Sequence, residues 1–439
     1  MASLAACAAY HDRPLASGPD LAPSAARLRV DVSQLRLAPL NARRFDPSDG
    51  LDPGEAAVLA VLNSPDLAAK RAIAHVAAAQ AFSAGLLPDP QLALSLDVPV
   101  PAGFTNAYNI APSLDLIGLI TRSAALRAAR ASAGQADLDL LWSEWSAAQQ
   151  ARGLAVSILG GEAKARVLAE VDQGLEARSR QSDLAFRRGD VAAAQASADR
   201  AAELDARAQL AAARAAAAKA RGDLNALIGL APGVVLPLVP GAPGAEPGAP
   251  ALEAALASLP RRRPDLLALK AGYGAQDANL RRAILTQFPV VNLGFSHQSD
   301  TSGVVTNGPT ATFTIPIFNR GRGEIAIQSA TRERLAAEYQ ARLDQSAADV
   351  AAARRERDAA RAVLARLEAR VPALVAMAGQ ARTALGRGDI DSAAFLALDQ
   401  AALRARVSLL DQRLALDLAD VGLDTVLFLP SEEEASHGP

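Results

Sequence analysis

The sequence predicts a mainly α-helical fold with short β-hairpins, in which a helix–hairpin–long-helix repeat occurs twice. Half of the 439 residues are hydrophobic but only 4% are aromatic, and the abundance of alanine favours long, closely packed helices. Two short stretches alternate apolar and polar residues with the period of half-buried strands. Landmark residues also recur about 200 positions apart, which indicates a duplicated unit.

Residues 1–52 are expected to form an N-terminal lipobox region followed by an extended arm. The string LAAC at 4–7 reads as a bacterial lipobox, with Cys7 as the acylated residue. Six residues cannot supply the charged and apolar segments of a signal peptide, so this interpretation requires a start upstream. The alternative is that Cys7 is a buried or chance cysteine. As the only cysteine, Cys7 excludes disulfides within the chain and Cys metal sites.

The first structural repeat is predicted over 53–230. A helix over 53–84 ends before two prolines, which break helices. Two alternating runs over 91–117, separated by a loop with two prolines and a glycine, predict a β-hairpin. Helical sequence then returns over 121–186, a length of roughly 100 Å if unbroken. After a glycine-containing turn, a second helix completes the repeat.

The second structural repeat, at 260–428, has the same order of elements and follows a Pro- and Gly-rich linker over 231–259. Its strands are expected over 290–318, with a polar loop at 298–308 between them. Residues 429–439 form an acidic tail that is predicted to be disordered. Three pairs of landmarks, separated by 199, 200 and 199 residues, indicate the duplication: Pro90 and Pro289, Arg122 and Arg322, and Gly189 and Gly388.

The predicted strands each have one apolar and one polar face. Leu94 in the first run and Phe313 in the fourth are expected on the apolar faces, and Ser95 and Thr312 on the polar ones. A plain coiled-coil hairpin protein has no need of two such hairpins at equivalent positions. This pattern suits strands with lipid on one side and water on the other.

Several strings resemble the TolC-like outer-membrane factors, a family of outer-membrane efflux proteins. They are AGLLPDP at 84–90, RRRPDLLALKA at 261–271, TFTIPIFNRGRGE at 312–324 and GDLNALIGL at 222–230, and the resemblance covers roughly 54–428. It implies a homotrimer in the bacterial outer membrane, with a 12-stranded β-barrel and a periplasmic α-helical barrel. It also implies a passive channel for efflux or secretion, and it favours a lipid anchor on Cys7.

The resemblance further implies that the two helix turns lie at the periplasmic end, where a periplasmic adaptor, or membrane fusion protein, docks. The inner-membrane pump would then be an indirect partner. An entrance gate of acidic residues is expected just after the second turn, although the family's usual acidic positions are Ala394 and Ala397 here. The docking candidates are Arg187, Arg188, Gly189, Arg387, Gly388 and Asp389, and the gate candidates are Asp389, Asp391 and Asp399.

The sequence contains no motif for an enzyme, a cofactor or a metal site, and we expect none of these. The net charge of −2 gives no indication of a nucleic-acid partner. Two other classes stay open: a periplasmic coiled-coil adaptor or scaffold protein, and a soluble alanine-rich coiled-coil protein. An adaptor needs compact β-domains, and a soluble coiled coil has no apolar strand faces, so the channel is preferred.

Overall fold

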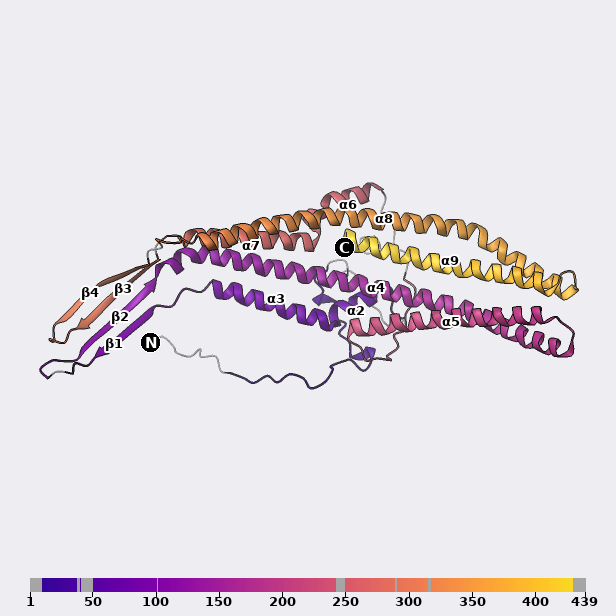
Figure 1. Cartoon of the computed structure of the whole chain (residues 1–439), viewed down its shortest axis with the longest axis horizontal. Coiled ribbons are helices and arrows are strands. Elements are labelled where there is room, and N and C mark those ends of the chain that lie inside the picture. The colour runs from indigo at the N-terminus through magenta and orange to yellow at the C-terminus, as the bar shows by residue number, and fades with distance from the viewer. Residues whose placement is uncertain are drawn as a thin grey trace.

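The chain forms a long, narrow molecule with a β-sheet at one end and the turns of two helical hairpins at the other (Figure 1). This computed structural model describes residues 10–37, 40, 50–100, 102–241, 249–288, 290–314 and 317–428. The elements in chain order are η1 (Ala25–Arg27), η2 (Val32–Gln34), α2 (Pro53–Asn63), α3 (Pro65–Ala84), β1 (Gln91–Asp97), β2 (Ala107–Asp115), α4 (Leu116–Arg188), α5 (Ala193–Ile228), α6 (Ala249–Arg262), α7 (Pro264–Leu285), β3 (Val290–Ser299), β4 (Val305–Thr314), α8 (Arg322–Arg387) and α9 (Ser392–Leu427).

The predicted duplication is confirmed by the helix boundaries. Both bounds of α5 become those of α9 when 199 is added, and α4 and α8 end at Arg188 and Arg387, again 199 apart. Below, the residue 199 positions away in the other repeat is called the counterpart. Helices α5 and α9 therefore occupy equivalent positions in the two repeats, and α4 and α8 end at equivalent positions.

The structure corrects two helix predictions made from the sequence. The helix expected over 53–84 is two helices, because Pro65 begins a new one and Ser64 caps it by accepting a hydrogen bond from the Leu67 amide. The segment predicted as a linker contains α6, which ends at Arg262 immediately before the break that precedes Pro264. Pro264 is the counterpart of Pro65, so α6 and α7 repeat the arrangement of α2 and α3.

The four strands form one antiparallel sheet in the order β1-β2-β3-β4. The predicted hairpins are confirmed, but the second is longer than expected. β3 continues to Ser299 and β4 begins at Val305, so most of the predicted loop at 298–308 is strand. Polar side chains such as His297 and Asn307 concealed the alternation there. These two residues lie opposite each other in the ladder.

The sheet has one mainly apolar and one polar face, and His297 and Asn307 are polar residues on the mainly apolar side. Leu94 lies opposite Ile110 and Val291 opposite Phe313, and directly opposed residues point to the same side. The apolar face is open to the surroundings in the single chain, where Leu94 is 68% and Phe313 58% exposed. The residues of the opposite face include Ser95, Asp97, Asn109, Ser113, Asn292, Ser296, Gln298, Thr306, Thr310, Thr312 and Thr314.

The helices are held by small apolar clusters spread along their length, as the alanine-rich composition predicts. One cluster joins Ile158 of α4 to Leu224 and Ile228 of α5. Another lies where Leu35 and Leu37 of the N-terminal arm pack near Trp145 of α4. The arm is also fixed through backbone bridges, Ala22 with Leu230 and Leu51 with Leu238.

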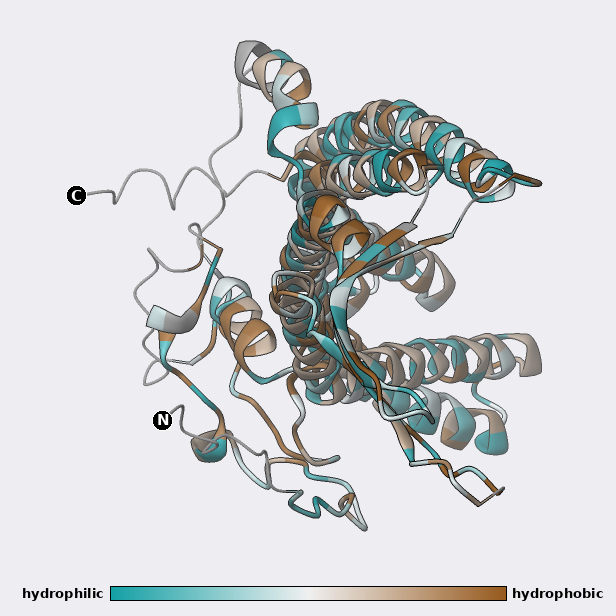
Figure 2. Cartoon of the chain, turned by 90° about the vertical axis from the view of Figure 1, so that its left-hand side faces the viewer, coloured by the Kyte–Doolittle hydropathy of each residue, from teal (hydrophilic) through white to brown (hydrophobic). Residues whose placement is uncertain are grey.

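Seen from the sheet end, the long helices follow an open arc rather than a closed bundle (Figure 2). The α4–α5 pair and the α8–α9 pair are separate antiparallel hairpins, and α4 also contacts α9. No helix within the described ranges has both the length and the hydropathy to cross a membrane.

Candidate functional site

The two helical hairpins turn at Gly189 and Gly388, as predicted. Both glycines close their helix with a left-handed backbone, at φ values of 83° and 80°, which a residue without a Cβ adopts at little cost. The predicted docking residues Arg187, Arg188, Arg387 and Asp389 are exposed around these turns. The structure thus brings the two tips to the same end of the molecule (Figure 1). Their part in docking stays a prediction.

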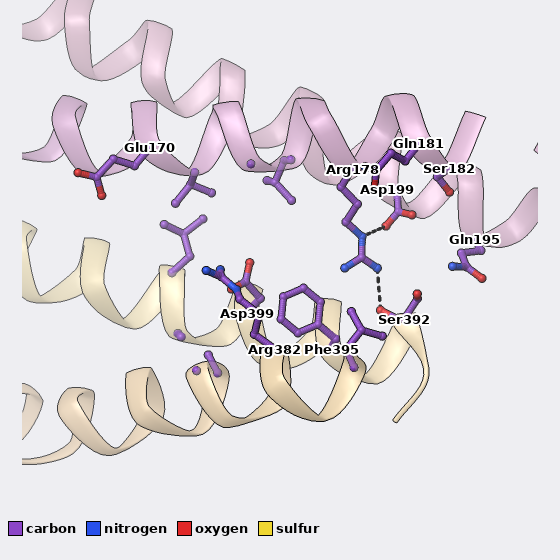
Figure 3. A pocket seen from close by; sticks show the side chains of 18 of the residues that line it. Glu170, Arg178, Gln181, Ser182, Gln195, Asp199, Arg382, Ser392, Phe395 and Asp399 are labelled. Carbon is purple, nitrogen blue, oxygen red and sulfur yellow. Dashed lines mark hydrogen bonds and ion pairs between the residues drawn. The ribbon is translucent and has the colours of Figure 1, made fainter. Parts of the chain in front are cut away.

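A groove lies just behind the tips, between the two hairpins. It encloses about 810 Å³ and is lined by residues of all four long helices, including Arg178, Asp199, Arg382 and Phe395. Figure 3 shows Arg178 extending from the α4–α5 hairpin toward Ser392 and Phe395 of the other hairpin. The groove therefore lies between the two hairpins, close to their turns.

Arg178 joins three helices across this groove. Its Nε donates to Asp199 Oδ1 of α5 at 2.8 Å, and its Nη2 donates to the carbonyl oxygen of Ser392, the first residue of α9, at 2.7 Å. The guanidinium carbon also lies 5.3 Å from the centre of the Phe395 ring, within cation–π range. Arg178 is 18% and Asp199 2% exposed, so this contact is largely shielded from water.

Asp399, a predicted gate residue, is part of an ion pair within the second hairpin. Its carboxylate lies 3.5 Å from the Arg382 guanidinium. The counterparts of Arg382 and Asp399 are Asp183 and Arg200, which also form an ion pair, with the charges exchanged. An ion pair at this position therefore links the two helices of each hairpin.

We expect that the double substitution Arg382→Asp with Asp399→Arg retains the stability of the wild-type chain. Each single reversal should cost roughly 0.5–1 kcal/mol, because it places like charges opposite each other at a largely exposed site. Chemical unfolding of the assembled protein would measure this. If the double variant is as unstable as the sum of the singles, the ion pair is not what links the arms here.

The other two predicted gate residues are not brought into contact with Asp399. The Asp391 side chain accepts a hydrogen bond from the Ala394 amide and caps the start of α9. Asp389 is exposed, and its own amide donates to the Ala384 carbonyl. No group of three or more acidic, His or Cys residues suited to a metal ion occurs among the described residues.

Further from the tips, ion pairs also join α4 to α9. Arg152 contacts Asp424 at 3.1 Å and Lys164 contacts Asp411 at 2.8 Å. Burial raises the pKa of Asp424, and the neighbouring Arg152 opposes that rise. Together with Arg178, these cations on α4 hold the first hairpin against the second along the length of α9.

Solved structures with the same arrangement include several outer-membrane channels. The outer-membrane channel OprN superposes with a TM-score of 0.74 at 18% identity, covering 96% of this chain and 99% of that chain. The CmeC outer-membrane channel of Campylobacter jejuni gives 0.74 at 16% identity, with 88% of each chain covered. The outer-membrane protein VceC of Vibrio cholerae gives 0.71 at 16% identity, with 85% of this chain and 95% of that chain covered.

The chain has the TolC-like fold. No protein-family model and no curated protein sequence matches it. At this level of identity the likeness extends to the fold, and the residues of the groove have to be judged on their own contacts. The fold accounts for the shared position of the sheet, the paired hairpins and the two tips.

Sequence reasoning missed Arg178, which contacts Ser392 and Phe395 across the groove. In a helix rich in alanine and arginine, nothing in its immediate sequence distinguishes it. Its counterpart is Met377, so the two repeats carry different residues at this position. The predicted lipidation site, Cys7, lies outside the described residues.

Proposed function

We propose that this chain is the outer-membrane channel component of a tripartite efflux or secretion system and acts as a passive conduit. The observation that carries this proposal is the sheet, which has a mainly apolar and a polar face and lies at one end of two long helical hairpins. The TolC-like fold supports the channel over a periplasmic adaptor or scaffold. The conduit itself needs no catalytic residue or cofactor.

The sheet would serve the channel only as part of a larger barrel. Strands β1 and β4 are edges in the single chain, and unpaired strand edges cannot face lipid. Strands of 10 residues, such as β3 and β4, match the ~9–11 residues that span a bilayer when tilted. Three copies would give a 12-stranded barrel with the polar faces toward water and the helices extending as an α-helical barrel.

The direction of the molecule follows from the barrel. With the sheet in the outer membrane, the helices extend into the periplasm, and the tips at Gly189 and Gly388 are the part farthest from it (Figure 1). A periplasmic adaptor that couples the channel to an inner-membrane pump would therefore meet these tips. The exposed Arg187, Arg188 and Arg387 offer positive charge at that contact.

Opening would require the two hairpins to separate at the groove behind the tips. Arg178 and the ion pairs along α9 resist this movement, so we assign the closed state to their contacts. An acidic gate at Asp389, Asp391 and Asp399 stays a prediction, and two of these carboxylates already have partners within the chain. A lipid anchor on Cys7 likewise stays a prediction.

Gly388→Leu should abolish export while leaving the assembled oligomer intact. The space around Gly388 is open, so the substitution adds no clash but strains a left-handed turn and changes the surface offered to the adaptor. Gly388→Asn is the matched control, because asparagine tolerates this backbone conformation. Export by cells carrying each variant, with oligomer content measured in parallel, would test this. Normal export by Gly388→Leu would remove the second tip from the docking surface.

The channel itself can be tested in planar lipid bilayers. Purified protein should insert, conduct ions in discrete steps and behave as an oligomer of three copies in detergent. A monodisperse, water-soluble monomer without conductance would contradict the proposed function.

A further inference from the structure

The two helix tips have the same backbone but present different side chains. The first tip is residues 184–192 and the second tip is residues 383–391, which are counterparts throughout. In each, the turn glycine has a left-handed backbone, and the amide of the aspartate that follows it donates at 2.9 Å to a carbonyl, that of Ala185 or of Ala384. The turn therefore forms without any side chain that only one tip has.

The first difference between the tips is apolar. Leu184 and Phe186 are 51% and 47% exposed on the first tip. Their counterparts are Thr383, which is polar, and Leu385, which is half-buried and lines the groove behind the tips. Phenylalanine is enriched at protein interfaces and supplies much of their binding energy when it is covered. The first tip thus offers an apolar anchor that the second lacks.

The second difference is charge. The first tip has two arginines and one aspartate, whereas the second has one arginine and two aspartates. Arg188 and its counterpart Arg387 lie in the last turn of their helices, where a cation is favourable without any partner, and Asp391 caps α9. Arg187 is different, because its counterpart Gly386 shows that the turn needs no cation there. Among the residues that the structure describes, Arg187 has no ion-pair partner.

We propose that the two tips are not equivalent, and that the first tip recognises a periplasmic protein surface that offers an apolar contact to Phe186 and a carboxylate to Arg187. The second tip meets the same partner through the shape of its turn and not through charge. This inference rests on the proposed function, because it needs a partner that docks at the tips. It adds the chemistry of that partner, which follows from charge complementarity.

Matched substitutions in cells test the difference between the tips. Arg187→Glu and Gly386→Glu give both turns the same Glu-Arg-Gly-Asp sequence, and the space around Gly386 is open. Arg187→Glu should reduce export roughly tenfold, because like charges then meet at the contact, whereas Gly386→Glu should leave export nearly unchanged. The assembled oligomer, measured in parallel, should be the same in both. Equal loss in the two variants, or no loss in Arg187→Glu, would overturn the proposal.

The chemistry of the partner is tested with the purified channel in lipid nanodiscs. The probes are two synthetic helical-hairpin peptides with a leucine at the turn, which is flanked by glutamates in one peptide and by lysines in the other. The glutamate peptide should bind roughly tenfold more tightly, added salt should weaken it, and Arg187→Glu should reverse the preference. Equal binding, a preference for lysine, or no binding of either peptide would overturn the carboxylate assignment.

The apolar contact is tested with the same glutamate peptide. Phe186→Ala should weaken its binding roughly tenfold, as expected for an aromatic anchor, whereas Thr383→Ala at the exposed counterpart of Leu184 should not. Unchanged binding to Phe186→Ala would overturn the anchor. A purified chain that neither forms an oligomer nor conducts would contradict the proposed function, whereas a conducting oligomer whose tips respond alike would overturn only this inference.

Discussion

Arg178→Ala should raise the passive conductance of the reconstituted channel several-fold without an adaptor. The substitution removes the contact to the Ser392 carbonyl at the start of α9 and leaves Asp199, which is 2% exposed, without its cation. Of these two polar contacts, only the hydrogen bond to Ser392 crosses to the other hairpin, and a hydrogen bond from a charged group contributes about 1.5–3 kcal/mol, enough to shift a closed arrangement of the hairpins toward an open one. Single-channel recording in planar bilayers is the measurement.

Two further variants separate the effects of this substitution. The double variant Arg178→Ala with Asp199→Ala has no unpaired Asp199 carboxylate, but it also lacks the hydrogen bond to Ser392. If its conductance is still raised, the contact between the hairpins is what maintains the closed state. Arg180→Ala is the matched control, because Arg180 is 70% exposed and its ion pair is with Glu176 of the same helix. Wild-type conductance in Arg178→Ala would place the constriction elsewhere.

Leu94→Arg should sharply reduce the amount of assembled channel in the outer membrane, and Phe313→Arg should do the same. Both side chains lie on the apolar face of the sheet and are open to the surroundings in the single chain. An arginine at the midplane of a bilayer on the lipid side of a barrel costs roughly 2–4 kcal/mol. Heat-resistant oligomer in membrane fractions would report the loss.

The controls for this prediction are the neighbouring residues Ser95 and Thr312, whose side chains lie on the polar face. Arginine at either position would face water and should leave most of the oligomer in place. Equal loss in all four variants would mean that both faces of the sheet are packed, and the orientation of the sheet toward lipid would then be wrong.

Much of the fold was predictable because the sequence contains two copies of the same structural repeat. The ends of α5 and α9 and the turns at Gly189 and Gly388 follow from the repeat distance and from glycine chemistry. Helix α6 was missed because prolines and glycines precede it, although the pair Pro65 and Pro264 shows that a second copy of α2 must end there.

The candidate site was less predictable, because its residues come from separate helices. The turn glycines are marked by their local sequence, whereas Arg178, Asp199 and Phe395 meet only once the hairpins lie side by side. Asp399 was selected by its charge as a gate residue, and that role stays a prediction. Its ion pair with Arg382 links the two arms of the second hairpin, as the pair of Asp183 with Arg200 links the arms of the first.

In the proposed channel, the matched lengths of α5 and α9 would also limit how its reach across the periplasm can vary. Both helices have 36 residues, so the two tips are level. An insertion in only one helix of a hairpin would tilt its tip or disrupt the packing between its two helices. Packing along the hairpins is kept only when whole helical repeats are gained or lost, roughly 10 Å for seven residues. A lineage that adapts to a wider or narrower periplasm would therefore change all four arms together, in steps of that size.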